Sequence, residues 1–221
     1  NPKSNLASMG IYIFSWPVLK EALVKLKNEP GCDFGKHVIP YVKEQGGRIF
    51  AYEFNEYWKD VGTLGSYWQA NMELVDIIPE FNLYEEYWKI YTKSDNVKPQ
   101  YLGPDAEVNR SLISEGCEIL GKVENSVLGT GVVVSEGAVV RDSIIMSDVT
   151  IGEGTVLDKC IVAEQSSIGS NCELGVGEYA ESTLDPRVYQ FDLVTVADHT
   201  TIPDGVKIGK NTAIKGETTA E

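Results

Sequence analysis

The segment best suited to chemistry is Tyr57-Trp58-Lys59-Asp60-Val61-Gly62-Thr63, which combines two aromatic rings, an acid and a glycine. Asp60 follows a segment with strand character and precedes Gly62, and α/β domains bind ligands at such strand ends. Its carboxylate could hold Mg²⁺ against phosphate oxygens. The same carboxylate could cap a helix that begins at Leu64. The local sequence fits both roles equally.

Three other side chains could bind a sugar or a phosphate, and each has a structural alternative. Trp58 could pack on a sugar face or inside the core. The Ser8 hydroxyl could bind sugar, phosphate or only solvent, and Lys36 could offset phosphate charge or be a surface lysine. Asp33 fits the N-cap of a short helix that runs to Val42. These signals strengthen one another because they fall in one predicted layer.

The histidines and cysteines give weaker signals. We expect His199 to be a solvated turn residue, because a catalytic base needs an orienting partner and a substrate groove. We expect His37 to be a helix-surface or packing residue. The cysteines lack metal-binding spacing and are predicted to be small buried hydrophobic residues of a protein in the reducing cytosol: Cys32, Cys117, Cys160 and Cys172.

The composition excludes several classes of partner. The formal net charge is -14 and the pI is about 4.6, so the surface repels nucleic acid and anionic lipid. No apolar run approaches the roughly eighteen residues of a membrane-spanning helix. The chain begins at Asn1 without an initiator Met or signal peptide, which indicates a fragment or a processed chain.

The first part of the chain alternates predicted strands and helices, which is typical of an α/β layer. A continuous apolar run predicts a buried strand over 10–14, and residues 48–54 predict a second. Apolar spacing predicts helices over 17–26, 64–75 and 84–91. Two strands are few for a doubly wound sheet, so this part resembles one portion of a larger domain.

A polar segment over 93–105, with Pro99, Gly103 and Pro104, is predicted to be a linker between domains at 1–92 and 106–221. Beyond it apolar residues recur every six positions, which indicates a β-helix whose triangular coils have one short strand per side. We expect every sixth residue to face the core. Residues 175–195 break the period and predict a projecting insertion.

Three series carry this repeat. The first is Val127, Val133, Val139, Ile145, Ile151 and Leu157; the second is Ile144, Thr150, Val156, Val162, Ile168 and Leu174; the third is Val196, Ile202, Ile208 and Ile214.

Several motifs together resemble bacterial glucose-1-phosphate adenylyltransferase (ADP-glucose pyrophosphorylase) in order and spacing, and the hexads resemble its C-terminal left-handed β-helix. The motifs are Ser4-Asn5-Leu6-Ala7-Ser8-Met9-Gly10-Ile11-Tyr12-Ile13-Phe14, Asp33-Phe34-Gly35-Lys36 with Ile39-Pro40, and Tyr57-Trp58-Lys59-Asp60-Val61-Gly62-Thr63 with Tyr67-Trp68-Gln69-Ala70-Asn71. The resemblance implies part of a Rossmann-like nucleotidyltransferase domain followed by that β-helix.

The resemblance also implies a function: ATP and glucose 1-phosphate form ADP-glucose and diphosphate in cytoplasmic glycogen synthesis. Ser8 would contact glucose 1-phosphate, and Asp60 would be one of two aspartates that bind Mg²⁺. Trp58, Asp33 and Lys36 would line the sugar side. Such enzymes are homotetramers or hetero-oligomers with a paralogous subunit, and small-molecule effectors regulate them.

The family's Gly-rich nucleotide loop, its first metal aspartate and its sugar-phosphate lysine belong before Asn1. We therefore expect the 221-residue chain to be inactive alone and the 10–14 strand to lack sheet neighbours. Three alternatives stay open: a non-catalytic regulatory paralogue, another sugar-1-phosphate nucleotidyltransferase, and a hexapeptide acyltransferase or a fusion with one. The intact Asp60 disfavours the first, and the lack of a convincing histidine site disfavours the last.

Overall fold

The computed structural model describes residues 4–89, 91, 96–179, 185–189 and 191–216. The chain divides into two compact units, residues 1–56 and 57–221. Within the described residues, no helix has the length and apolarity needed to cross a membrane. The predicted linker over 93–105, between domains at 1–92 and 106–221, stays a prediction.

The first unit is helical. Helix α1 (Trp16–Leu26) follows Ser15 and has Pro17 in its first turn, where the missing N–H costs nothing. A π-helical turn, η1 (Phe34–Val38), continues directly into α2 (Ile39–Glu44). The core of this unit is small: Ala22, Val38 and Val42, with Phe14, Leu19, Leu26 and Tyr41 packed around them.

Three predicted elements do not form. Residues 10–14 and 48–54 are not strands, and Ile13 and Phe50 are 99% and 84% exposed. An extended segment needs a neighbouring strand to bond its backbone groups, and the described part of the first unit contains no sheet. Residues 84–89 form turns and bends rather than a helix, with Tyr87 99% exposed. Aromatic spacing alone did not specify a helix there, because no apolar surface covers the rings.

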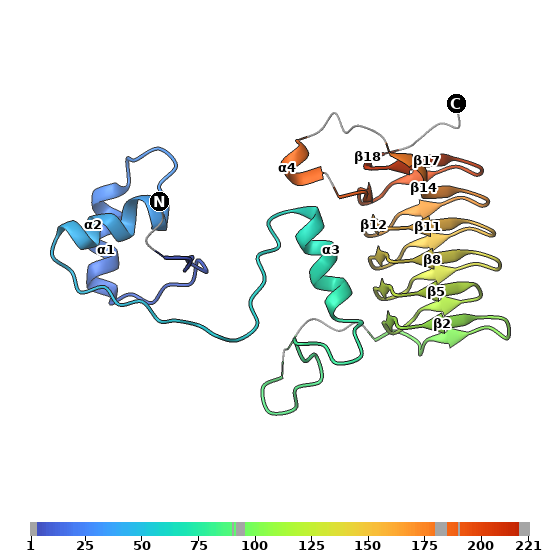
Figure 1. Ribbon diagram of the computed structural model, residues 1–221, viewed down its shortest axis with the longest axis horizontal. Helices are drawn as coiled ribbons and strands as arrows, with labels where there is room; N and C mark the ends of the chain where they lie inside the picture. The colour runs from blue at the N-terminus through green and yellow to red at the C-terminus, as the bar shows by residue number, and fades with distance from the viewer. Residues whose placement is uncertain (1–3, 90, 92–95, 180–184, 190, 217–221) are drawn as a thin grey trace. The chain divides into compact units, whose positions relative to one another are not determined.

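The second unit is dominated by a parallel β-helix built from three six-stranded sheets (Figure 1). The first sheet contains β1 (Tyr101–Leu102), β4 (Glu118–Ile119), β7 (Val133–Val134), β10 (Thr150–Ile151), β13 (Ser167–Ile168) and β16 (Thr201–Ile202). The second contains β2 (Glu107–Asn109), β5 (Lys122–Glu124), β8 (Val139–Arg141), β11 (Val156–Asp158), β14 (Glu173–Tyr179) and β17 (Lys207–Lys210). The third contains β3 (Leu112–Ile113), β6 (Val127–Leu128), β9 (Ile144–Ile145), β12 (Cys160–Val162), β15 (Val194–Val196) and β18 (Thr212–Ile214). The predicted β-helix is confirmed.

The register of the core differs from the prediction in the early coils. Val133 is only partly buried, whereas Val134 beside it is fully buried, and the same shift makes Leu128 and Val140 the core residues. From Ile145 onward the first series does face the core. The reason is the length of a coil: equivalent residues are 15 or 17 positions apart, so a strict count of six drifts by one or more residues per turn.

The second series shows the same drift. Ile144 is buried on the outer face of its sheet, and Thr150 is exposed, whereas Val162, Ile168 and Leu174 enter the core. In the third series Val196 and Ile202 are buried in the core, and Ile208 and Ile214 pack against it. A hexad repeat thus identifies the fold, but the corner geometry decides which residue of each pair faces inward.

Buried hydroxyls tie successive coils together at one corner. Ser126 Oγ accepts a hydrogen bond from the backbone N–H of Ser143 at 3.1 Å. Ser143 Oγ accepts one from Cys160 in the next coil at 3.0 Å. Neighbouring positions Asn125, Asp142 and Lys159 have positive φ values, which turn the chain sharply at that corner.

The predicted insertion falls where a coil lengthens. Thr200 donates its backbone N–H to Ser166 Oγ across 34 residues, twice the usual step. Strand β14 extends to Tyr179, and the short helix α4 (Pro186–Tyr189) follows; residues 180–184 and 190 lie outside the described residues.

Candidate functional site

Ser8 lies in a hydrogen-bonded cluster of the first unit. Its Oγ is 2.9 Å from the Tyr12 hydroxyl and accepts the backbone N–H of Gly10 at 3.2 Å. The Tyr12 ring stacks on Phe34 with centroids 5.8 Å apart. The Ser8 hydroxyl is therefore held in place while remaining exposed.

Asp33 begins η1, as the sequence predicted. Its Oδ1 accepts the backbone N–H of Lys36 at 2.7 Å, and its own N–H donates to His37 Nδ1 at 3.0 Å. His37 is partly buried and hydrogen-bonded within η1, which agrees with the helix-surface or packing role expected of it. A Cβ placed on Gly35 would lie 3.4 Å from Asp33 Oδ1 and 3.9 Å from the Tyr12 hydroxyl, so the clusters of Ser8 and Asp33 adjoin.

Asp60 is exposed and makes a local turn, with Oδ1 accepting the backbone N–H of Gly62 at 3.0 Å. It does not cap the following helix, α3 (Leu64–Glu73). Thr63 does so: its hydroxyl accepts the N–H of Ser66 at 3.1 Å, and Ser66 Oγ accepts the N–H of Thr63 at 3.2 Å. The helix-cap alternative for Asp60 is therefore wrong, and its carboxylate is left for another role.

Asp60 fits one ligand of a magnesium ion, not a complete site. Among the described residues no group of three His, Cys, Asp or Glu side chains is placed to hold a metal. Mg²⁺ is typically held by one or two carboxylates, with substrate phosphates and water completing the shell. A single exposed carboxylate suits that arrangement, and the metal role of Asp60 stays a prediction.

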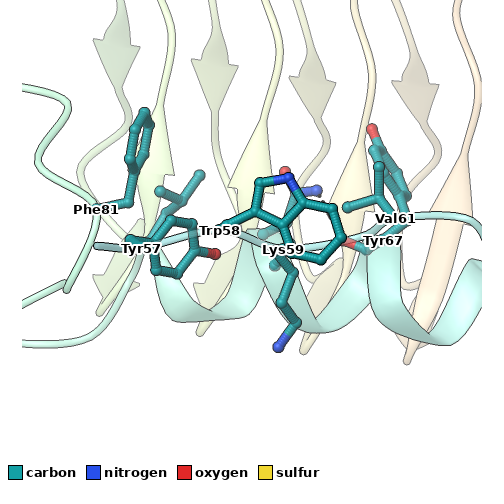
Figure 2. Close-up of a pocket in the computed structure, with 9 residues that line it drawn as sticks. Tyr57, Trp58, Lys59, Val61, Tyr67 and Phe81 are labelled. Atoms are coloured by element: carbon teal, nitrogen blue, oxygen red, sulfur yellow. Dashed lines mark hydrogen bonds between the residues drawn. The ribbon is translucent and has the colours of Figure 1, made fainter. Parts of the chain in front are cut away.

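An open groove of about 380 Å³ adjoins Asp60 in the second unit. It is lined by Tyr57, Trp58, Lys59, Val61, Tyr67, Ala70, Asn71, Leu74 and Phe81. Figure 2 shows Tyr57 and Phe81 at one end, Val61 and Tyr67 at the other, and the Trp58 ring between them. Trp58 is 44% exposed, so it presents a ring face at the surface rather than filling the core.

The residues on either side of Trp58 are tied to the end of α3. Lys59 Nζ lies 2.6 Å from Glu73 Oε1, and the Tyr57 hydroxyl donates to Glu73 Oε2 at 2.9 Å. The hydrogen bond from Lys59 lowers the pKa of the Glu73 carboxyl, and that from Tyr57 lowers it further. Burial raises the pKa of the Tyr57 hydroxyl, and Glu73 raises it further.

The predicted site residues thus form two groups, Ser8, Asp33 and Lys36 in the first unit and Trp58 and Asp60 in the second. Sequence reasoning missed Tyr12 and Glu73. Tyr12 could have been found from its position four residues after Ser8, because Gly10 between them allows a turn that brings the two hydroxyls together. Glu73 gave no signal, because its partners lie 14 and 16 residues away.

The other polar candidates have structural roles. His199 has a positive φ of 52° and a side chain 69% exposed, as expected for a turn residue. Cys117, Cys160 and Cys172 are buried as predicted, and burial raises the pKa of the Cys160 thiol to about 12. Cys32 is exposed, so that prediction was wrong; it follows the turn at Gly31, where no core forms.

Comparison with known proteins agrees with both units. The family described as "Nucleotidyl transferase" matches residues 1–77, and "GlmU-like, C-terminal hexapeptide" matches residues 100–191. A glucose-1-phosphate adenylyltransferase of Lachnospira eligens is 65% identical over 221 residues, covering 100% of this chain and 52% of the relative. The chain is thus similar over its whole length to a protein named glucose-1-phosphate adenylyltransferase.

Other relatives of the same name are 48% identical, from Acetivibrio thermocellus, and 54% identical, from Thermotoga neapolitana, covering 100% and 96% of this chain. The chain spans about half the length of these relatives, 52% and 51% respectively. The resemblance inferred from the motifs is thereby confirmed. Part of a nucleotidyltransferase domain precedes a left-handed hexapeptide β-helix, as predicted.

Proposed function

We propose that the protein containing this chain transfers the adenylyl group of ATP to glucose 1-phosphate, forming ADP-glucose and diphosphate for glycogen synthesis in the cytoplasm. The observation that carries the proposal is the 65% identity, which extends over the whole chain to a protein named for that reaction. The aligned region includes both groups of candidate residues and the β-helix.

In this reaction a phosphate oxygen of glucose 1-phosphate attacks the α-phosphorus of ATP in line. The protein contributes positioning and charge neutralisation rather than covalent chemistry. The Ser8 hydroxyl, held by Tyr12, and the nearby Asp33 would bind the sugar phosphate, with Lys36 offsetting its charge. The exposed ring face of Trp58 would cover the sugar, and Asp60 would supply one carboxylate to Mg²⁺. The metal would neutralise charge on the phosphates.

The proposal extends to the assembly. We propose a homotetramer, or a hetero-oligomer with a paralogous subunit, that is regulated by small-molecule effectors. The β-helix would provide subunit contacts, because both ends of its sheets carry strand edges without a neighbour among the described residues. The 221-residue chain alone is expected to be inactive.

The test compares this chain with one extended before Asn1 to the length of its relatives. We expect the extended protein to release diphosphate from ATP and glucose 1-phosphate with Mg²⁺, and the shorter chain to release none. Faster turnover with UTP, GTP or dTTP would indicate another sugar-1-phosphate nucleotidyltransferase, and no turnover with any nucleotide would indicate a regulatory paralogue. Acyl transfer from acyl-CoA would overturn the proposal.

A further inference from the structure

Burial alternates along the segment that carries Asp60. Tyr57 and Lys59 are partly buried, whereas Trp58 and Asp60 are exposed. Successive side chains of an extended chain point to opposite sides. Tyr57 and Lys59 therefore direct their polar atoms to Glu73 at the end of α3, whereas Trp58 and Asp60 keep exposed surface for a ligand.

Glu73 holds the first pair with both of its carboxylate oxygens. Oε1 binds Lys59 Nζ at 2.6 Å and Oε2 accepts the Tyr57 hydroxyl at 2.9 Å. Hydrogen bonds that involve ionised groups are stronger than neutral ones. The side chains of Lys59 and Glu73 are 25% and 30% exposed, so water and salt screen this pair less than a surface pair. The ammonium group of Lys59, which precedes Asp60 in the sequence, is thus paired with Glu73.

The end of α3 that carries Glu73 is packed against the β-helix. Glu73 is the last residue of α3, next to the buried Met72. Met72 packs with Ile144 and Ile161 on the outer face of the third sheet. Figure 2 shows the β-helix strands behind α3 and the side chains of Tyr57, Trp58, Lys59 and Val61 in front. A carboxylate on a docked helix is a firm anchor for an otherwise irregular segment.

We propose that Glu73 is a positioning residue: by holding Tyr57 and Lys59 against α3, it directs Trp58 and Asp60 toward the substrates. The role of those two residues rests on the proposed function, but the anchoring by Glu73 does not. Glu73 contacts the segment from the side of Tyr57 and Lys59, so it acts through these residues rather than on a substrate.

The first experiment measures anchoring in the 221-residue chain. Hydrogen exchange at the hydrogen-bonded amides of Gly62, Thr63 and Ser66 is compared for the wild type, Glu73→Gln and the matched control Glu107→Gln. Glu107 pairs with Lys122 at 2.7 Å on the β-helix surface, so the control also removes one carboxylate from a lysine pair. We expect exchange about tenfold faster in Glu73→Gln alone, since local opening governs exchange. Equal exchange in all three would overturn the proposal.

Tyr57→Phe provides a second variant in case Glu73→Gln does not fold. It removes one hydrogen bond to Glu73 and keeps the ring that lies 5.6 Å from Phe81. We expect a smaller acceleration at the same amides, and little further effect when it is added to Glu73→Gln, because both changes break one network. If the effects of Tyr57→Phe and Glu73→Gln on exchange add fully in the double variant, the two residues do not act through one shared network.

The second experiment uses the extended protein. Glu73→Gln should raise the KM for glucose 1-phosphate and the Mg²⁺ concentration for half activation about tenfold, with Glu73→Asp nearer the wild type. Kinetics of Glu73→Gln equal to those of Glu107→Gln would refute the positioning role. An inactive wild type with faster exchange in Glu73→Gln would refute the proposed function and leave the anchor standing.

Discussion

The indole Nε1 of Trp68 donates a hydrogen bond to the backbone carbonyl of Asp142 at 2.6 Å, across 74 positions of sequence. Trp68 belongs to α3, and Asp142 is a coil corner with a φ of 47°. Lys159, the equivalent corner of the next coil, places its Nζ 5.4 Å from the Trp68 ring centroid. The helix after the Asp60 segment is thus fastened to two successive coils of the β-helix.

Replacing Trp68 by Phe should destabilise the second unit, because it leaves the Asp142 carbonyl without its indole donor and shrinks the packed ring. We expect a loss of about 1–2 kcal/mol in the free energy of unfolding, or roughly 2–8 °C in Tm. Thermal unfolding followed by circular dichroism measures it. Trp88→Phe is the control: Trp88 is 84% exposed and should change little. Equal effects in the two variants would show that Trp68 is not an anchor.

The core register can be tested with two adjacent valines of β7. Val134→Ala should cost about 2 kcal/mol, because Val134 is fully buried and its loss leaves a cavity. Val133→Ala should cost less than about 1 kcal/mol, because Val133 is only partly buried. Urea unfolding of the 221-residue chain separates them. A larger loss of stability for Val133→Ala than for Val134→Ala would support the strict six-residue register instead.

The hydroxyl ladder makes a separate prediction. Ser143→Ala removes the acceptor of the buried Cys160 N–H, and an unsatisfied buried donor costs about 1–3 kcal/mol. Ser167→Ala on β13 is the control, because Ser167 is exposed. Thermal unfolding should show a lower Tm only for the Ser143 variant. An unchanged Tm would mean that water replaces the lost hydroxyl.

In the extended protein, Asp60→Asn should lower kcat by about 100-fold or more, because under the proposed function Asp60 supplies a carboxylate to Mg²⁺ and such a ligand contributes several kcal/mol. The fold should be unaffected, since Asp60 is exposed and an amide oxygen can still accept the Gly62 N–H. Diphosphate release and Tm are the two measurements, and Asp76→Asn, which affects a surface pair with Arg110, is the control. Wild-type turnover would remove Asp60 from the mechanism.

The stability that Glu73 contributes through its hydrogen bonds to Lys59 and Tyr57 should be lost at both low and high pH. The folded state lowers the pKa of Glu73, chiefly through the Lys59 hydrogen bond, so its contribution is full above the ordinary carboxyl pKa and is lost as pH falls through the lowered value. Burial, Glu73 and Glu80 raise the pKa of Tyr57, so the Tyr57 hydrogen bond is full below the ordinary tyrosine pKa and is lost as pH rises through the raised value.

The difference in Tm between wild type and Glu73→Gln measures this dependence, because other titrating groups largely cancel. We expect a constant difference between roughly pH 5 and pH 9 that shrinks below about pH 4. A difference that grows as pH falls would contradict the sign of the Glu73 shift.

Several features followed from the sequence because local spacing encodes them. The hexads gave a β-helix, Asp33 preceded a turn whose amides its side chain could bind, and His199 fell between polar corner residues. The motifs around Ser8 and Asp60 gave the resemblance that the comparisons confirmed. Each of these signals lies within a few residues or repeats at a fixed period.

Only the tertiary structure decided which of Val133 and Val134 enters the core, because coils of 15 or 17 residues shift the six-residue count. It alone placed Ile144 beneath α3 and brought Glu73 to Lys59. It also left residues 10–14 without a strand, since backbone pairing requires a partner that a local pattern does not supply. These outcomes depend on contacts between distant segments, which a pattern within one segment does not specify.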